Sequence, residues 1–158
     1  IEYLADNYDD GELRPPNGTP EALAYTYLLH YAEGSFMPLM IISLILARID
    51  TAPMPFFIKP VARGITGKVR SGYLSANVSN NLAFVEQALA QSTWFCGDTF
   101  TAADVQMSFP LEAAEVRIDL ADDYPHIDGF LRAIRARPAY KTALDRGGHY
   151  ELMGGLGR

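Results

Sequence analysis

Cysteine is almost absent from this chain, since Cys96 is the single one among 158 residues. One cysteine excludes an internal disulfide, and a reducing compartment is the simpler setting for such a chain. No secretory signal is visible at the start, so we expect a cytoplasmic protein. Histidine is also scarce: His30, His126 and His149 are scattered along the sequence. Scattered histidines give little support to a metal site, and we expect none.

Excess positive charge and long apolar runs are also lacking. The net charge of −6 disfavours nucleic acid as a partner, because phosphate binding needs clustered Lys and Arg. The longest apolar run, residues 36–47, contains Pro38 and is too short to span a bilayer, so we expect no membrane contact.

The sequence has no initiator Met and opens on residues that resemble the middle of a helix. We therefore expect a piece of a longer protein.

No alternating strand pattern of useful length is present, and the sequence shows no internal repeat. Apolar residues instead recur at spacings of three and four, between breakers rich in Pro and Gly. The pattern predicts an all-α bundle of about five helices, with a linker before Thr19 and a loop over residues 51–63. The expected helices cover residues 20–50 with a kink at Pro38, residues 64 or 67 to 91, residues 101–118, residues 125–135 and residues 138–145.

One stretch gives an unusually clear signal for the start of a helix. Thr101 is the expected N-cap, and Asp104 stands three residues later, where its carboxylate can return to the cap N–H. Phe100 and Val105 occupy the positions of a hydrophobic staple across the cap. The nearly continuous apolar segment that follows predicts a central, buried helix.

This stretch also carries a family resemblance. Trp94, Gly97, Phe100 and the segment Thr101-Ala102-Ala103-Asp104-Val105 match the cap-and-staple motif of glutathione S-transferases. The chain resembles the C-terminal helical domain of that family over essentially its whole length. The segment Tyr31-Ala32-Glu33-Gly34-Ser35-Phe36-Met37-Pro38 is similar to a bacterial and fungal branch, and the closing segment Ala136-Arg137-Pro138-Ala139-Tyr140 matches the family's last helices.

The resemblance implies a division of labour between two domains. Residues 1–18 correspond to the tail of a thioredoxin-like N-terminal domain and the interdomain linker, and residues 19–158 to the helical domain. The missing domain supplies the catalytic residue, so none is expected in this chain. The implied partners are glutathione as co-substrate, with no other cofactor, small hydrophobic electrophiles, and a second copy in a homodimer. The implied role is detoxification.

Candidate site residues follow from the resemblance and from residue type. Glu33 aligns with a cleft-facing position and can pair with the glutathione α-amino group or hold a water near its sulfur; the alternative is a solvated glutamate. Aromatic and Met side chains suit a pocket for varied apolar molecules, although core packing or a dimer interface is the better explanation for each of them taken singly. The candidates for the electrophile pocket are Tyr27, Tyr31, Phe36, Met37, Met40, Phe109, Glu112, Ala113 and Val116.

Other features leave alternatives open. Residues 51–85 contain no acidic residue but carry four cations, which indicates either a site for anionic partners or an ordinary solvated face. The stretch Phe56-Phe57-Ile58 suits a lid over the cleft or an interface patch. His30 is expected in packing or at the surface, and Cys96 in a structural rather than a redox role.

Two functions are therefore weighed. In the first, the intact protein lets glutathione thiolate attack an electrophile or a peroxide, since lowering the pKa of the thiol is the main catalytic act. This chain then forms the hydrophobic-substrate wall and is inactive alone. In the second, the domain is a non-catalytic assembly module, as transferase-like domains are in translation factors and tRNA synthetases. The polar Glu33-Gly34-Ser35 segment favours the enzyme.

Overall fold

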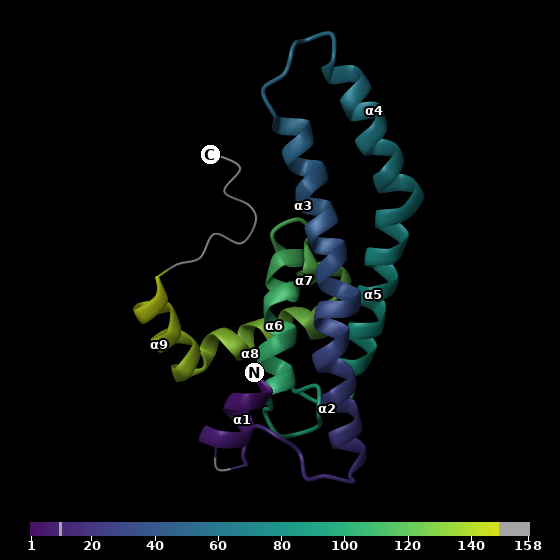
Figure 1. Ribbon diagram of the computed structural model, residues 1–158. Coiled ribbons are helices and arrows are strands. Elements are labelled where there is room, and N and C mark those ends of the chain that lie inside the picture. Colours follow the sequence, from purple (N-terminus) through teal and green to yellow (C-terminus); the bar gives the residue numbers. More distant parts are fainter. Residues whose placement is uncertain (10, 149–158) are drawn as a thin grey trace.

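The computed structural model describes residues 1–9 and 11–148, and within them the chain is helical with no β-strand. The short helix α1 (Glu2–Tyr8) precedes a linker, and two long antiparallel helical arms follow. The central helix α6 (Ala102–Glu115), the short α7 (Leu120–Asp123), α8 (Pro125–Ala136) and α9 (Pro138–Gly147) complete the domain. Figure 1 shows the two long arms on one side, with α1, α8 and α9 on the other. The predicted all-α bundle is confirmed.

The first arm is one continuous helical segment made of α2 (Pro20–Tyr31), the π-helical turn η1 (Ala32–Phe36) and α3 (Met37–Thr51). Thr19 caps its start, since the Thr19 hydroxyl accepts from Ala22 N–H at 3.2 Å. In η1 the N–H of Met37 donates to the carbonyl of Ala32, five residues back. A wider turn placed directly before Pro38 accommodates a residue that has no N–H to donate. The predicted irregularity at Pro38 is therefore a π-turn.

This arm, Pro20–Thr51, is long and apolar enough to cross a membrane by length and composition, since an 18-residue window within it has a mean hydropathy of 1.6, and a third of that window is buried. The sequence predicted a helix over residues 20–50, but the expectation that it does not span a bilayer considered only the apolar run of residues 36–47. Length and composition alone are weak grounds for a span, because the core helix of a soluble bundle passes the same test. The arm packs along α6 inside the domain.

The second arm begins earlier than the sequence predicted. It consists of α4 (Lys59–Val69), a second π-turn η2 (Arg70–Leu74) and α5 (Ser75–Leu89). Pro60 stands in the first turn of α4, where a missing N–H costs nothing, so the proline starts the helix instead of excluding it. The acidic segment after α6, which lies outside the helices expected from the sequence, forms α7, whose N-terminus is capped by Asp119.

The core lies where α6 meets the first arm and α8. Among the α6 residues with no solvent exposure, these fall at spacings of three and four along the helix: Ala103, Met107, Leu111 and Ala114. Burial on nearly all sides explains why this helix carries few charged residues. The predicted central position of the capped helix is confirmed.

Candidate functional site

The start of α6 is fixed by a buried carboxylate. Asp104 has no solvent exposure, and its oxygens accept from Phe95 N–H at 2.9 Å and from Thr101 N–H at 2.7 Å. The capping box predicted from Thr101 and Asp104 is present. Burial raises the pKa of Asp104, although the hydrogen bonds from Phe95 and Thr101 oppose the shift. Asp104 therefore fixes the loop before the helix as well as the helix itself.

The other half of the predicted motif has different neighbours from those expected. The Phe100 ring packs edge-on against Trp94 at 4.9 Å, and the Arg137 guanidinium lies 3.5 Å from the centre of the Phe100 ring. Val105, the expected staple partner, is exposed. Phe100 therefore joins the loop before α6 to the start of α9, which follows Arg137.

A hollow of about 710 Å³ lies beside this cap, between the linker and the loop before α6. The N–H of Ala102 donates to the carbonyl of Leu13 at 2.9 Å, which ties the linker to the first residue of α6. Cys96 lines the hollow but is itself buried, and burial raises the pKa of its thiol. A raised pKa disfavours the reactive thiolate, which agrees with a structural role for this cysteine.

Glu33 lies in η1, at the junction between the first arm and α6. Its side chain is exposed, and its Oε1 accepts a hydrogen bond from Gln106 Nε2 at 2.6 Å. The π-turn matters here because it shifts the helical register and so sets where Glu33 points. Sequence reasoning did not find Gln106, since nothing at that position distinguishes it from any other polar residue in a helix.

An apolar strip on α6 runs beside this pair. Val105, Phe109 and Val116 are exposed and fall at helical spacing along one face. Glu112 belongs to the same face but is buried, with its Oε1 accepting from Tyr140 at 2.7 Å and from Arg135 at 3.3 Å. Arg135 also pairs with Glu115. The structure therefore places Glu112 in a polar network joining α6, α8 and α9, covered from solvent, which corrects its assignment to an open pocket wall.

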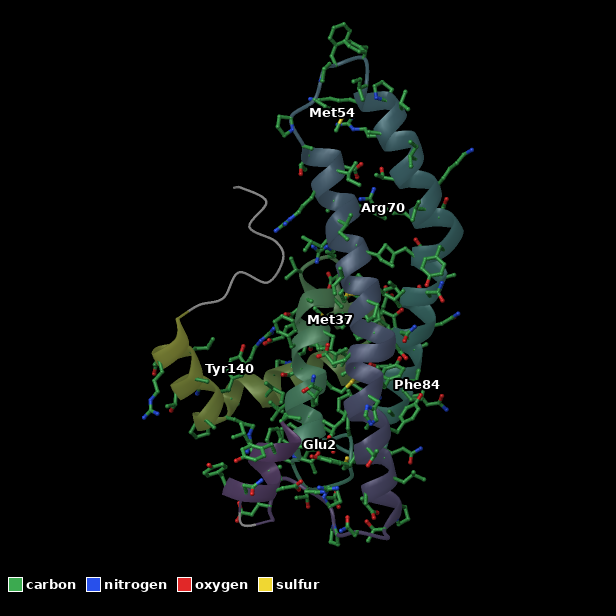
Figure 2. All side chains as sticks on the ribbon, in the orientation of Figure 1. Glu2, Met37, Met54, Arg70, Phe84 and Tyr140 are labelled. Carbon is green, nitrogen blue, oxygen red and sulfur yellow. The ribbon has the colours of Figure 1, made fainter. Side chains whose placement is uncertain are left out.

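The remaining pocket candidates do not gather in one place. Tyr27 and Tyr31 stack at 5.7 Å and face Phe84 of α5, and Tyr31 donates to Asn81 at 2.5 Å. Burial, together with Tyr27, raises the pKa of Tyr31 to about 12. These tyrosines therefore bridge the two arms through Phe84, which Figure 2 labels on the second arm.

Burial separates the other candidates. Phe36 and Ala113 have no solvent exposure, so both belong to the core and the pocket assignment is corrected for them. Met37 is nearly buried. Met40 lines a separate hollow of about 330 Å³ between α3, α5 and α6, together with Arg70 and Arg117. Of the pocket candidates, Tyr27, Phe109 and Val116 remain exposed.

Among residues 1–9 and 11–148 no group of three or more His, Cys, Asp or Glu side chains converges. His149 lies outside the described residues.

Comparison with known proteins shows which family has this architecture. Residues 71–138 match the model for "Glutathione S-transferase, C-terminal domain". Glutathione S-transferase 1 of Saccharomyces cerevisiae is 30% identical over 148 residues, which cover 92% of this chain and 63% of the yeast protein. Glutathione S-transferase 3 of Schizosaccharomyces pombe is 30% identical over 146 residues, 92% of this chain and 60% of that protein. The chain therefore spans less than two thirds of these relatives.

Solved structures of glutathione transferases show the same similarity. A glutathione transferase from Methylococcus capsulatus superposes with a TM-score of 0.67 at 28% identity, covering 94% of this chain and 64% of that one. A sphingomonad glutathione S-transferase, solved in complex with glutathione, shares the fold with a TM-score of 0.67 at 24% identity, covering 95% of this chain and 66% of that one. These matches, together with the capped central helix, support a glutathione S-transferase C-terminal domain.

Proposed function

We propose that this chain is the helical half of a glutathione transferase whose glutathione site is completed by a thioredoxin-like domain preceding Ile1. The observation that carries the proposal is the exposed Glu33–Gln106 pair beside the apolar strip of Val105, Phe109 and Val116. A carboxylate next to an apolar wall suits a ligand with an ammonium group at one end and an apolar reaction partner at the other.

In this proposal Glu33 binds the glutathione α-amino group, and Gln106 holds the carboxylate in place. The chemical step belongs to the glutathione sulfur: its thiolate forms a bond to an electrophilic carbon, and the leaving group departs with the electron pair. The α6 strip excludes water from one side of the electrophile. A solved relative was crystallised with glutathione, which supports glutathione as the partner here.

The proposal includes a homodimer and a role in detoxification. Three isoleucines of α3, at intervals of four residues, are exposed on one face of the first arm: Ile41, Ile45 and Ile49. A row of exposed branched side chains on a rigid helix is a surface that a second copy can cover.

A turnover assay tests the enzymatic proposal. The longer protein, expressed with the residues that precede Ile1 in its gene, is expected to conjugate glutathione to a chloronitroaromatic substrate. The chain of 158 residues alone is expected to stay at the background rate. Turnover by the chain alone would overturn the division of labour. A folded longer protein without turnover would overturn the enzymatic proposal and favour the assembly module.

A further inference from the structure

The loop between the two arms and the first helix of the second arm form a tip that the proposed function does not use. Figure 1 shows α3 and α4 meeting in a loop at the top, with α1 at the opposite end of the molecule. Met54 lies in this loop in Figure 2. We define the hairpin tip as residues 52–69, which comprise the loop after α3 and the whole of α4.

The hairpin tip exposes far more apolar surface than ordinary packing explains. Phe56 and Phe57 are adjacent and are 84% and 64% exposed, with their rings 5.6 Å apart. An apolar row continues along the outer face of α4, at spacings of three and four residues: Ile58, Val61, Ile65 and Val69, all exposed. Contiguous exposed apolar residues of this kind mark an interaction surface.

The charge at the hairpin tip has one sign. Lys59, Arg63 and Lys68 are exposed, and no acidic residue occurs between positions 51 and 85. The chain as a whole carries −6, so its acids lie elsewhere. A helix with an apolar face and cations, following two exposed aromatic side chains, has the composition of segments that lie in the interface of a bilayer containing anionic lipids.

The hairpin tip is also held in position. The Thr66 hydroxyl donates to Asp50 Oδ1 at 2.6 Å, and Arg70 pairs with Asp50 Oδ2 at 2.6 Å. These two contacts fix α4 against the end of α3 and occupy the last carboxylate before the hairpin tip. The apolar row and the cations therefore stay on a rigid element, and little conformational entropy is lost when a surface covers them.

From these observations we propose that the hairpin tip docks the protein onto a membrane surface rich in anionic lipid. Phe56 and Phe57 insert at the level of the head groups, while Lys59, Arg63 and Lys68 face the lipid phosphates and carboxylates. The arm Pro20–Thr51 stays packed along α6, so the contact is peripheral. This proposal replaces the expectation of no membrane contact that was drawn from the short apolar run.

Vesicle co-sedimentation tests the proposal with the chain of 158 residues. The protein is expected to pellet with vesicles of phosphatidylcholine and phosphatidylserine, more weakly with phosphatidylcholine alone, and less at high salt. The double variant Phe56→Ser/Phe57→Ser is expected to lower the partition coefficient about tenfold or more. The matched control Tyr3→Ser/Tyr8→Ser removes two exposed aromatics at the opposite end and should leave binding unchanged.

The contribution of the cations and the depth to which the hairpin tip inserts are measured separately. Lys59→Glu/Arg63→Glu should remove the preference for phosphatidylserine, whereas the control Arg132→Glu/Lys141→Glu, on α8 and α9, should keep it. In Phe57→Trp, emission should shift to the blue and be quenched by brominated lipid. Circular dichroism verifies that each variant is folded.

Three results would overturn the proposal. The first is no pelleting of the wild-type chain with either kind of vesicle. The second is unchanged pelleting of the Phe56→Ser/Phe57→Ser variant. The third is a change in sedimentation coefficient of that variant in vesicle-free buffer, which would make the hairpin tip a contact between copies of the chain.

Discussion

Gln106 donates a hydrogen bond to Glu33 across 73 residues of sequence, at 2.6 Å. The contact joins the π-turn of the first arm to the second turn of α6. The hydrogen bond therefore holds the Glu33 carboxylate, which is proposed to bind glutathione, against α6. The position of α6 is well fixed, because the helix is buried and Asp104 holds its start. The capping segment and the candidate site are therefore linked through a single helix.

Replacing Asp104 by Ala is expected to lower the free energy of unfolding by about 2–4 kcal/mol, because the buried N–H groups of Phe95 and Thr101 lose their acceptor. Urea unfolding followed by circular dichroism measures the change. Asp98→Ala, at an exposed position in the same loop, should stay within about 0.5 kcal/mol of wild type. An Asp104→Ala protein as stable as wild type would show that the cap does not hold the helix.

The stability contributed by Asp104 should depend on pH in an unusual direction. Burial raises its pKa in the folded state above the value of about 3.9 in an unfolded chain. At a pH between these two pKa values the folded state binds more protons than the unfolded state. The stability that Asp104 contributes is therefore complete below its pKa in the unfolded chain and falls as the pH rises through its pKa in the folded protein. The stability of wild type relative to Asp104→Asn should therefore decrease as the pH rises above about 4. A relative stability that increases with pH would contradict this direction.

Arg135 pairs with both Glu112 and Glu115, and Glu112 is only 2% exposed. Replacing Arg135 by Met should destabilise the domain by roughly 2–3 kcal/mol, less than the loss of a fully buried pair because Arg135 is itself partly exposed. Chemical denaturation measures the loss. The double variant Glu112→Gln/Arg135→Met should regain part of the lost stability. It contains no buried carboxylate at position 112 that is left without its guanidinium partner.

The control for this network is Arg132→Met on the same helix, whose arginine is 72% exposed and pairs only with the nearby Asp128 among the described ion pairs. It should change stability by less than about 0.5 kcal/mol. Equal effects at Arg132 and Arg135 would show that the network of Glu112 contributes nothing specific.

The proposed dimer contact on α3 is tested by Ile45→Glu. A charge placed in the middle of the row formed by Ile41, Ile45 and Ile49 should shift the protein from dimer to monomer in analytical ultracentrifugation, because burying an unpaired carboxylate in an apolar interface is costly. Leu23→Glu, at an exposed position on α2, serves as the control and should remain dimeric. A wild-type protein that is monomeric at every concentration would contradict the dimer itself.

The sequence predicted the parts of this fold that depend on local chemistry. Pro20 after Thr19, Thr101 with Asp104, and Pro138 all start helices where expected, because caps and first-turn prolines act within a few residues. The start of α4 was misplaced because a cluster of prolines near Pro60 was taken to exclude a helix. The short α7 was missed because its acidic residues resemble a loop.

The candidate site was harder to predict than the fold. Glu33 was proposed from the family resemblance, but its partner Gln106 depends on how two distant helices approach each other, which no local pattern encodes. Residue type suggested one apolar pocket, whereas the structure distributes these residues among the core, the contact between the arms and the α6 strip. Periodicity identifies which residues share a face of one helix, not what covers that face.

Calorimetric titration of glutathione into the longer protein, comparing wild type with Glu33→Gln, tests the central claim most directly. A carboxylate that binds the α-amino group contributes about 1.5–3 kcal/mol, so Glu33→Gln should raise the dissociation constant roughly tenfold to a hundredfold. Glu21→Gln, an exposed glutamate on the same arm, should leave it unchanged. An unchanged dissociation constant in Glu33→Gln would contradict the account, because the Glu33–Gln106 pair would then play no part in binding glutathione.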